Sequence, residues 1–213
     1  QQGLAARVTY SWNDRYFFEA NAGYNGSENF SPDKRFGFFP AFGFGWAVSN
    51  ESWWESLQDV VSYLKVRYTD GLVGTDAVTG RRFMYLDQMA GLDGYRFGDQ
   101  NNGVGGWGYS KYGANVGWST SRKQDLGIDL KFMKDNLSLT LDVFKEHRKD
   151  IFITRRVIPD YSGFVEMPYA NLGVVDNKGF EATLEYTQQL GKKSFLTVRG
   201  NFSWNEDEIV END

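Results

Sequence analysis

Alternation of apolar and polar residues with a period of two is the feature that most constrains this chain. From Phe180 to Tyr186 every second residue is apolar, and glutamate or threonine fills the positions between them. After a short polar turn the same alternation resumes from Leu196 to Trp204. A period of two belongs to a β-strand with two unlike faces, so the two segments predict a pair of long antiparallel strands.

The same period recurs along the rest of the chain and predicts about eight strands in all. Each is near or above the roughly 9–11 residues that cross a membrane at a tilt. The apolar positions of the other six strands are Leu4, Ala6, Val8, Tyr10 and Trp12; Tyr16, Phe18, Ala20, Ala22 and Tyr24; Phe42, Phe44, Trp46 and Val48; Leu64, Val66 and Tyr68; Leu126, Ile128, Leu130 and Phe132; and Leu137, Leu139, Leu141 and Val143.

Short and long connections alternate between these strands. The shorter ones lie at Asn13-Asp14, Ser49–Gln58, Lys134-Asp135 and Gln188, and the longer ones are Asn25–Arg35, Gly71–Trp118 and Lys149–Val174. Within Ser49–Gln58, Ser52 and Glu55 have the spacing of a capping box and predict one helical turn. An up-and-down meander would place all short turns on one side, as transmembrane barrels do with their periplasmic turns and extracellular loops.

The second face of the strands is charged, as the wall of a water-filled lumen would be. It carries Arg7, Glu19, Lys65, Arg67, Asp129, Lys131, Asp142, Glu181, Glu185 and Arg199. Aromatic residues stand near strand ends on the apolar face, where the headgroup layer of a membrane favours them. A soluble sheet with one buried face alternates in the same way. The pattern therefore favours a membrane barrel and leaves the soluble sheet as an alternative.

Composition excludes several other classes of protein. The 213 residues carry 23 Lys and Arg against 28 Asp and Glu, a net charge of -5, which gives no basic surface for nucleic acid. There is no cysteine and only one histidine, His147, so neither a disulfide framework nor a multi-histidine metal cluster is expected. The mean hydropathy of -0.51 and the lack of a long apolar run exclude a helical membrane protein.

The first strand begins on the long-loop side, because its far end meets the tight Asn13-Asp14 turn. With eight strands the last one ends on the same side, so both ends of the chain are expected there. A complete barrel with an even number of strands, delivered from the periplasm, should have both ends on the short-turn side. We therefore expect an excerpt from a larger barrel, and a self-contained eight-stranded barrel is the alternative.

Several segments resemble one known family in the order in which that family carries them. They are "NDRYFFEANAGYNGSENF", "RFGFFPAFGFGWAVSNE", "VSYLKVRYTDGLVG", "FKEHRKDIFITR" and "NLGVVDNKGFE". Through them nearly the whole chain resembles the SusC-like TonB-dependent outer-membrane transporters, and the last segment is the most diagnostic.

The resemblance implies an all-β fold, an antiparallel up-and-down meander that forms part of a large, 22-stranded transmembrane β-barrel. Residues 1–213 would supply a later part of that barrel, without the plug domain and the closing strands. The family sits in the outer membrane of Gram-negative bacteria and imports oligosaccharides or peptides. The implied partners are TonB, acting through the missing plug, a SusD-like surface lipoprotein and the lipid bilayer.

No catalytic constellation and no cofactor motif is found, so the chain is not expected to be an enzyme. Asp59, Asp70 and Asp76 lack the spacing of a calcium loop, and His147 is interpreted as an ordinary surface or lumen residue. Asn171, Gly173, Asn177 and Gly179 are interpreted as structural turn residues.

Substrate contact is expected in the long loop Gly71–Trp118, because aromatic faces beside amide groups suit sugar rings or peptide side chains. The candidate residues are Tyr95, Arg96, Trp107, Tyr109, Tyr112 and Trp118. A second candidate segment carries Tyr161, Phe164 and Tyr169. Alternatively, these aromatics pack the loop itself or contact a lid partner. Two other functions stay open, a small outer-membrane barrel acting as an adhesin or structural protein and a soluble glycan-binding sheet.

Overall fold

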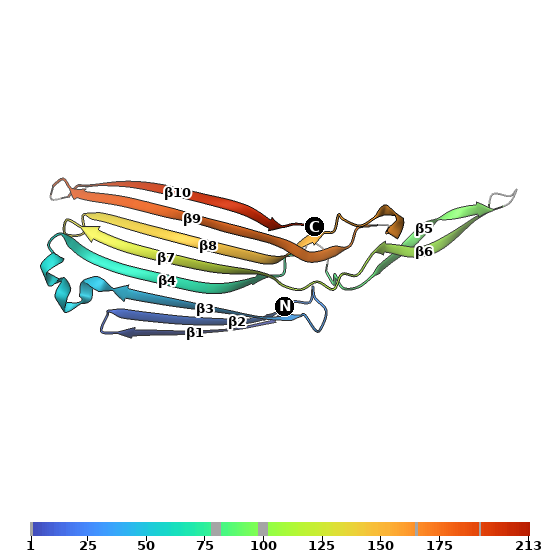
Figure 1. Cartoon of the computed structure of the whole chain (residues 1–213), viewed down its shortest axis with the longest axis horizontal. Helices are drawn as coiled ribbons and strands as arrows, with labels where there is room; N and C mark the ends of the chain where they lie inside the picture. Colours follow the sequence, from blue (N-terminus) through green and yellow to red (C-terminus); the bar gives the residue numbers. More distant parts are fainter. Residues whose placement is uncertain (1, 78–81, 98–101, 165, 192) are drawn as a thin grey trace.

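The computed structural model describes residues 2–77, 82–97, 102–164, 166–191 and 193–213. Within these residues, eight antiparallel strands form one long sheet in the order β1-β2-β3-β4-β7-β8-β9-β10, and β5 and β6 pair separately (Figure 1). The strands of the main sheet are β1 (Gln2–Trp12), β2 (Tyr16–Gly26), β3 (Phe36–Ala47), β4 (Val61–Thr75), β7 (Ser119–Phe132), β8 (Leu137–Thr154), β9 (Tyr169–Gln189) and β10 (Phe195–Glu211). The up-and-down meander predicted from the sequence is confirmed.

The remaining elements are short and belong to the connections. They are the hairpin strands β5 (Gln88–Phe97) and β6 (Asn102–Lys111) and the 3-10 helices η1 (Val48–Asn50), η2 (Ser52–Leu57) and η3 (Asp160–Ser162). In the described part of the chain no helix is long and apolar enough to cross a membrane. Strands β1 and β10 form the two edges, so the eight strands make an open sheet and not a closed small barrel.

The short connections gather at one end of the sheet, and the long connections and both chain ends at the other (Figure 1). At the first turn Asn13 and Asp14 adopt φ values of 50° and 51°, the left-handed conformation that tight hairpin turns require. Asparagine and aspartate tolerate that conformation better than other non-glycine residues. Local sequence therefore determines this turn.

The connection between β3 and β4 is held to the sheet by Glu51. Its carboxylate accepts hydrogen bonds from the Tyr16 hydroxyl at 2.9 Å and from Trp46 Nε1 at 3.1 Å, and Arg15 lies 3.3 Å away. The hydrogen bond from Tyr16, then that from Trp46 and the charge of Arg15 hold the pKa of Glu51 below its ordinary value. The connection is thus pinned to β2 and β3 and not free.

Helical structure between β3 and β4 is confirmed, but the predicted capping box is wrong. The residue that precedes η2 is Glu51, and no side chain caps that helix. Val48, expected at the end of the third strand, begins η1. The reason is local, because the Glu51 carboxylate is already engaged by Tyr16 and Trp46 and the chain turns away from the sheet at that point.

Two long connections contain more strand than the sequence pattern predicts. The expected loop Gly71–Trp118 contains the end of β4 and the β5–β6 hairpin. In the expected loop Lys149–Val174, the first residues belong to β8 and the last residues to β9. The last connection does not lie at Gln188, which pairs with Leu196; beyond it, Leu190 N–H donates to the Ser194 carbonyl at 2.9 Å. Glycine, asparagine and charged residues break the alternation in these segments, yet backbone pairing with a neighbouring strand continues through them.

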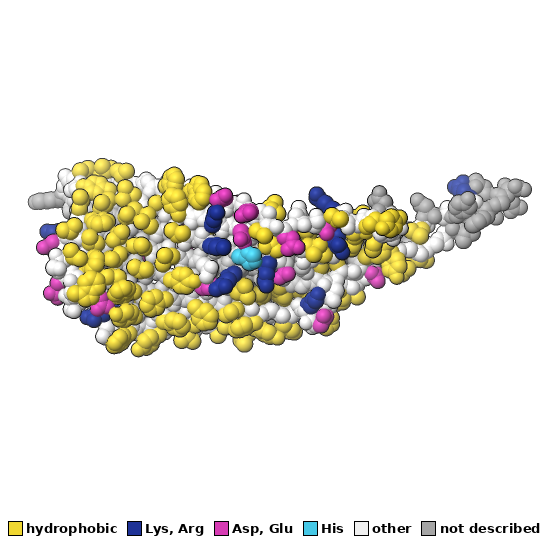
Figure 2. All heavy atoms as spheres, in the orientation of Figure 1, with side chains coloured by type: hydrophobic (Ala, Val, Ile, Leu, Met, Phe, Trp, Pro, Cys, Tyr) yellow, Lys and Arg dark blue, Asp and Glu magenta, His cyan; other side chains and the backbone are white. Residues whose placement is uncertain are grey.

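Each strand contributes its apolar positions to one face of the sheet, and among the residues that the structure describes no second layer covers that face. The register places Tyr10, Phe18, Phe44, Tyr68, Leu126, Val143, Phe180 and Trp204 in one unbroken row across all eight strands. Val198 is 57% exposed and Leu4 72% exposed on this face. Figure 2 shows the apolar side chains spread over the broad part of the sheet. A soluble sheet would bury this face, so the lipid-facing interpretation fits the structure.

The apolar positions of the eight strands together form a band on this face, the apolar band. It runs obliquely to the rows of the sheet, a row being the residues that pair with one another across neighbouring strands. On β1 its positions continue three rows beyond Tyr10 to Leu4, whereas on β10 they stop at Trp204, which shares a row with Tyr10. Strands that cross a membrane at a tilt of about 35–45° produce this offset. Beyond the band, charged side chains replace apolar ones on the same face of β7 to β10 (Figure 2).

The loops at the long-connection end enclose a small core of their own. Phe30, Met84, Ala114 and Val116 are buried there, and Trp118, Phe152 and Tyr169 pack against them. Hydrogen bonds join the same loops: Ala114 N–H donates to the Met84 carbonyl at 2.8 Å, and the Ser31 hydroxyl donates to Asn115 Oδ1 at 3.0 Å. This cluster, the loop core, fixes how the loops sit above the sheet.

Candidate functional site

The charged face of the sheet is organised around Arg67 on β4. Its guanidinium donates to Asp129 Oδ2 on β7 at 2.8 Å and to Asp142 Oδ1 on β8 at 2.9 Å. Gly127 is the residue between Arg67 and Asp142 in the row, so the Arg67 side chain reaches across a strand that presents no side chain there. A Cβ on Gly127 would lie 2.5 Å from Asp142 Oδ1 and 2.7 Å from Arg67 Cζ. This glycine makes the three-residue network possible.

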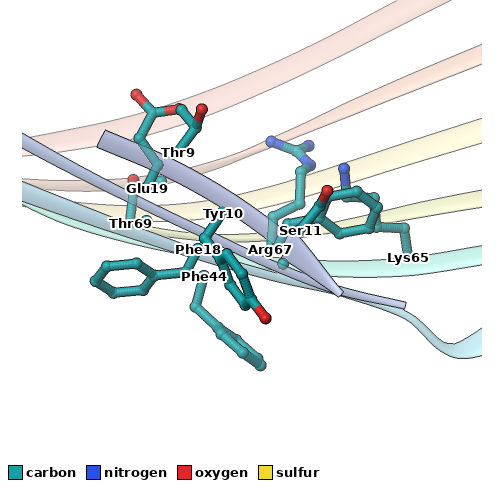
Figure 3. Close-up of a pocket in the computed structure, with 12 residues that line it drawn as sticks. Thr9, Tyr10, Ser11, Phe18, Glu19, Phe44, Lys65, Arg67 and Thr69 are labelled. Carbon is teal, nitrogen blue, oxygen red and sulfur yellow. The ribbon is translucent and has the colours of Figure 1, made fainter. Parts of the chain in front are cut away.

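Two further glycines, Gly43 and Gly45 on β3, form the floor of a groove on the same face. Its volume is about 450 Å³, and Figure 3 shows side chains from the flanking strands around it. Its polar lining is Thr9, Ser11, Glu19, Lys65, Arg67 and Thr69. These labelled side chains point to one side of the strands, and Tyr10, Phe18 and Phe44 point to the other (Figure 3).

The groove combines cations with an aromatic ring and an acid. Lys65 Nζ lies 4.5 Å from the centre of the Phe17 ring, within the range of a cation–π contact. Glu19 is bound by Arg7 at 2.7 Å and accepts a hydrogen bond from Asn21 at 2.7 Å. Such a surface can hydrogen-bond hydroxyl, amide or carboxylate groups of a passing solute.

The alternation in the sequence predicts Arg67, Lys65 and Glu19 on the polar face, but it predicts neither the Arg67 network nor the groove. The available signal was glycine at the inward positions of "FGFGW", where polar side chains would otherwise stand. The same signal occurs at Gly127 on β7. Its neighbours are β4, which carries Lys65 and Arg67, and β8, which carries Asp142. Glycine in a strand interior marks a place where other groups come close.

The six residues predicted for substrate contact fall into three places. Tyr95 and Arg96 lie in β5, paired with Val104 and Gly103 of β6. Trp107 on β6 is 75% exposed, and the Tyr109 ring stacks on Tyr112 with their centres 5.5 Å apart. The hairpin projects away from the sheet at the long-loop end (Figure 1). Trp107 and Tyr109 are thus exposed and Tyr112 is half-buried, and these three residues, with Tyr95 and Arg96, stay predicted contacts.

Trp118 lies elsewhere, in the loop core. Its ring meets those of Phe30 and Phe39 edge-on, with centres 5.3 and 5.1 Å apart, and its Nε1 donates to the Arg35 carbonyl at 3.2 Å. The structure therefore separates Trp118 from the hairpin aromatics. These contacts agree with the alternative interpretation, in which aromatic residues of the long loop pack the loop itself.

The second predicted segment is divided in the same way. Tyr161 in η3 is 92% exposed, and the Phe164 ring contacts Tyr112 edge-on with centres 5.0 Å apart. Tyr169 stacks on Phe152 with centres 4.7 Å apart and belongs to the packing of the loop core. Phe164 thereby links this segment to the β5–β6 hairpin and extends its aromatic surface.

The residues interpreted as turn residues lie inside β9, so that assignment is wrong. Asn171 has a structural role, because its side chain accepts from Gly117 N–H at 2.8 Å and donates to the Gly117 carbonyl at 3.1 Å. Gly179 leaves room for the ring of Phe144, whose Cζ would lie 2.6 Å from a Cβ at this position. Close approach within the sheet, and not a turn conformation, accounts for these residues.

His147 lies on the outward face and pairs with Asp176, away from the groove. Asp70 pairs with Arg122 at 2.6 Å, and Asp76 accepts from the Ser27 hydroxyl at 2.6 Å, so these acids have different partners in different places. Across the described ranges, no group of three or more histidine, cysteine, aspartate or glutamate side chains is arranged to hold a metal ion.

Comparison with known proteins agrees with this geometry. The chain is 29% identical to TonB-dependent receptor P39 of Formosa agariphila over 98% of its own length and 19% of the relative's. It is 26% identical to TonB-dependent receptor SusC of Bacteroides thetaiotaomicron, over 96% of this chain and 20% of SusC. The chain thus spans about a fifth of the length of the curated relatives it matches.

Solved structures share the fold. The RagAB peptide importer in its closed-closed state matches with a TM-score of 0.82 and 19% identity, over 99% of this chain and 22% of that one. Its open-open state matches with a TM-score of 0.81 and 21% identity, over 97% of this chain and 22% of that one. The family model described as TonB dependent receptor-like, beta-barrel, matches residues 1–213, and the chain belongs to that family.

Proposed function

We propose that this chain forms part of the wall of an outer-membrane import barrel in a Gram-negative bacterium. Residues 1–213 supply a run of neighbouring strands, and the plug domain and closing strands belong to other parts of the same receptor. The 22-strand count is carried over from the family resemblance. In this role the chain performs no catalysis and needs no cofactor.

The observation that carries the proposal is that the two faces of one uncovered sheet are opposite in character. One face presents an unbroken row of apolar and aromatic side chains across eight strands. The other presents ion pairs, such as Arg67 with Asp129 and Asp142, and a polar groove. A wall between hydrocarbon and a water-filled lumen requires this combination.

The imported solute is an oligosaccharide or a peptide. The groove over Gly43 and Gly45 offers cations, hydroxyl groups and an aromatic ring on the lumen side. At the long-loop end, Trp107, Tyr109 and Tyr112 offer aromatic faces, with Tyr95 and Arg96 on the same hairpin. Both places suit the hydroxyl and amide groups of these substrates. The substrate range is carried over from the family resemblance, and one similar solved structure is that of a peptide importer, RagAB.

The partners follow from the orientation of the sheet. Long loops of membrane barrels face the outside of the cell, so a SusD-like surface lipoprotein would sit over the β5–β6 hairpin and the loop core. TonB would act from the opposite side through the plug domain.

The experiment that tests the proposal compares arginine substitutions on the two faces of β9 in the whole receptor. Leu184→Arg puts a charge on the apolar face, where Leu184 is 48% exposed, and we expect a loss of about 2–4 kcal/mol in unfolding free energy in lipid. Thr183→Arg puts the same charge on the lumen face, and we expect little change. Leu139→Arg and Thr140→Arg, in the same rows on β8, repeat the comparison. Equal losses on both faces would refute the proposed orientation.

A further inference from the structure

Lys65 of β4 lines the lumen groove (Figure 3) but turns away from the acid that stands opposite it. The register pairs Lys65 with Asp129 of β7 on one side and with Ala47 of β3 on the other. Its Nζ nevertheless lies 4.5 Å from the centre of the Phe17 ring on β2. The side chain passes over Gly45, where a Cβ would lie 3.2 Å from Lys65 Cε. The glycine floor therefore lets the ammonium group enter the groove.

The acids nearest to the groove are already engaged by other groups. Arg67 donates to both oxygens of Asp129, at 2.8 and 3.3 Å. Glu19 is held by Arg7 at 2.7 Å. Among the residues that the structure describes, no carboxylate forms an ion pair with Lys65 and no group accepts a hydrogen bond from its ammonium. The three N–H donors of Lys65 are thus left for a solute in the groove.

The charges around the groove balance in number but not in position. Arg67 is shared between Asp129 and Asp142, so this network carries one net negative charge. Both of its acids lie on β7 and β8, and β7 is three strand spacings, about 14 Å, from β2. The compensating positive charge of Lys65 lies on the β2 side, over the Phe17 ring. The groove therefore presents positive charge beside a more acidic part of the same face.

An ammonium group in such a groove favours an anion. Charge-assisted hydrogen bonds are roughly twice as strong as neutral ones, so a carboxylate gains more from Lys65 than a hydroxyl or an amide does. The face of an aromatic ring attracts the cation without neutralising it. Hydroxyl groups of Thr9, Ser11 and Thr69 line the same groove and offer further hydrogen bonds to the neutral parts of a solute. Carboxylates are acidic groups that peptides and oligosaccharides share, in acidic amino acids and in uronic acids.

We propose that Lys65, held over the Phe17 ring, is a binding subsite for a carboxylate of the imported solute, so that the receptor favours acidic solutes over neutral ones. The carboxylate belongs either to a peptide or to a uronic acid of an oligosaccharide. The inference rests on the proposed function, because it requires the groove to face the lumen through which the solute passes.

The test offers the whole purified receptor in detergent a trypsin digest of casein and hydrolysates of pectin, starch and carrageenan, and identifies the retained solutes by mass spectrometry. We expect the wild type to enrich acidic peptides or uronates over neutral members of the same mixtures by about tenfold, and Lys65→Gln to lose that enrichment. Lys65→Arg should keep it, because the charge is kept. Salt at about 0.5 M should weaken it in the wild type, since salt screens a charge but not a shape.

Lys131→Gln is the matched control. Lys131 also lies over an aromatic ring on the lumen face, with its Nζ 5.6 Å from the centre of the Tyr63 ring, but it is not part of the groove. Its enrichment of acidic solutes should equal that of the wild type. Retained peptides would identify a peptide as the source of the carboxylate, and retained uronates an oligosaccharide.

Three results would overturn the inference: enrichment that survives in Lys65→Gln, retention of neutral or sulfated solutes alone, and no retained solute at all. The proposed function fails separately, if Leu184→Arg and Thr183→Arg destabilise the receptor equally.

Discussion

On the lumen face, glycines decide where side chains from neighbouring strands can come together. We expect Gly127→Ala to break the ion pair between Arg67 and Asp142, because the new methyl group would lie 2.5 Å from Asp142 Oδ1. The atoms that the methyl group meets are the ends of side chains that can move, so the loss should be that of a partly exposed ion pair, about 0.2–1 kcal/mol. Denaturant unfolding of the receptor in detergent measures the loss. Gly43→Ala is the control, since its Cβ would make only ordinary contacts of 3.7 Å on the same face. A loss as large at Gly43 would contradict the argument.

A second residue-level prediction concerns pH and the connection held by Glu51. Hydrogen bonds from Tyr16 and Trp46 lower the pKa of Glu51 in the folded state, so the folded protein binds this proton less readily than the unfolded chain. The stabilisation is therefore present above the ordinary glutamate pKa of about 4.3 and is lost as the pH falls through the lowered value. We expect Glu51→Gln to be less stable than the wild type at pH 7, with the difference vanishing in acid.

Unfolding midpoints measured from pH 7 down to about pH 3 test this prediction. Glu55→Gln is the control, because Glu55 is exposed on η2 in the same connection. It should follow the wild-type pH profile. A constant gap between Glu51→Gln and the wild type over the whole range would show that lost packing, and not titration, explains the effect.

At the scale of elements, the loop core decides how the long connections are held. Met84 is fully buried, and its carbonyl accepts from Ala114 N–H at 2.8 Å. We expect Met84→Ala to destabilise the loop core by about 2–5 kcal/mol through the cavity it leaves. Hydrogen exchange should quicken at residues 112–118 while the amides of β7 stay protected. Met133→Ala, at a turn position 61% exposed, should change neither. Faster exchange throughout β7 would mean that the loops and sheet unfold together.

The sequence predicted the strands better than it predicted their connections. Alternation is a property of residues i and i+2, so the apolar faces of β1 or β10 could be read directly from the chain. Trp118 and Phe30 are 88 positions apart, and nothing local indicates that their rings meet in the loop core. The lumen groove could not be predicted for the same reason, because it is formed by glycines and side chains from four strands whose register the local sequence does not give.

At the scale of the whole molecule, the oblique course of the apolar band predicts how deeply each strand position lies in the membrane. Ala20 on β2 and Lys178 on β9 belong to the same row of the sheet. Ala20 nevertheless lies within the apolar band of its strand, between Phe18 and Ala22, and Lys178 lies just beyond the band of β9. The tilt of the strands thus gives two positions of one row different surroundings.

We therefore expect Ala20→Lys to cost about 2–4 kcal/mol when the receptor unfolds from lipid vesicles, although the same row carries a native lysine on β9. Lys178→Ala should change that free energy little, since it removes a charge from the headgroup layer and not from hydrocarbon. Asn21→Lys supplies the control on β2, because it places the new charge on the lumen face one position away. If Ala20→Lys were tolerated as well as Asn21→Lys, the rows would run parallel to the membrane plane, and the tilt inferred from the apolar band would be wrong.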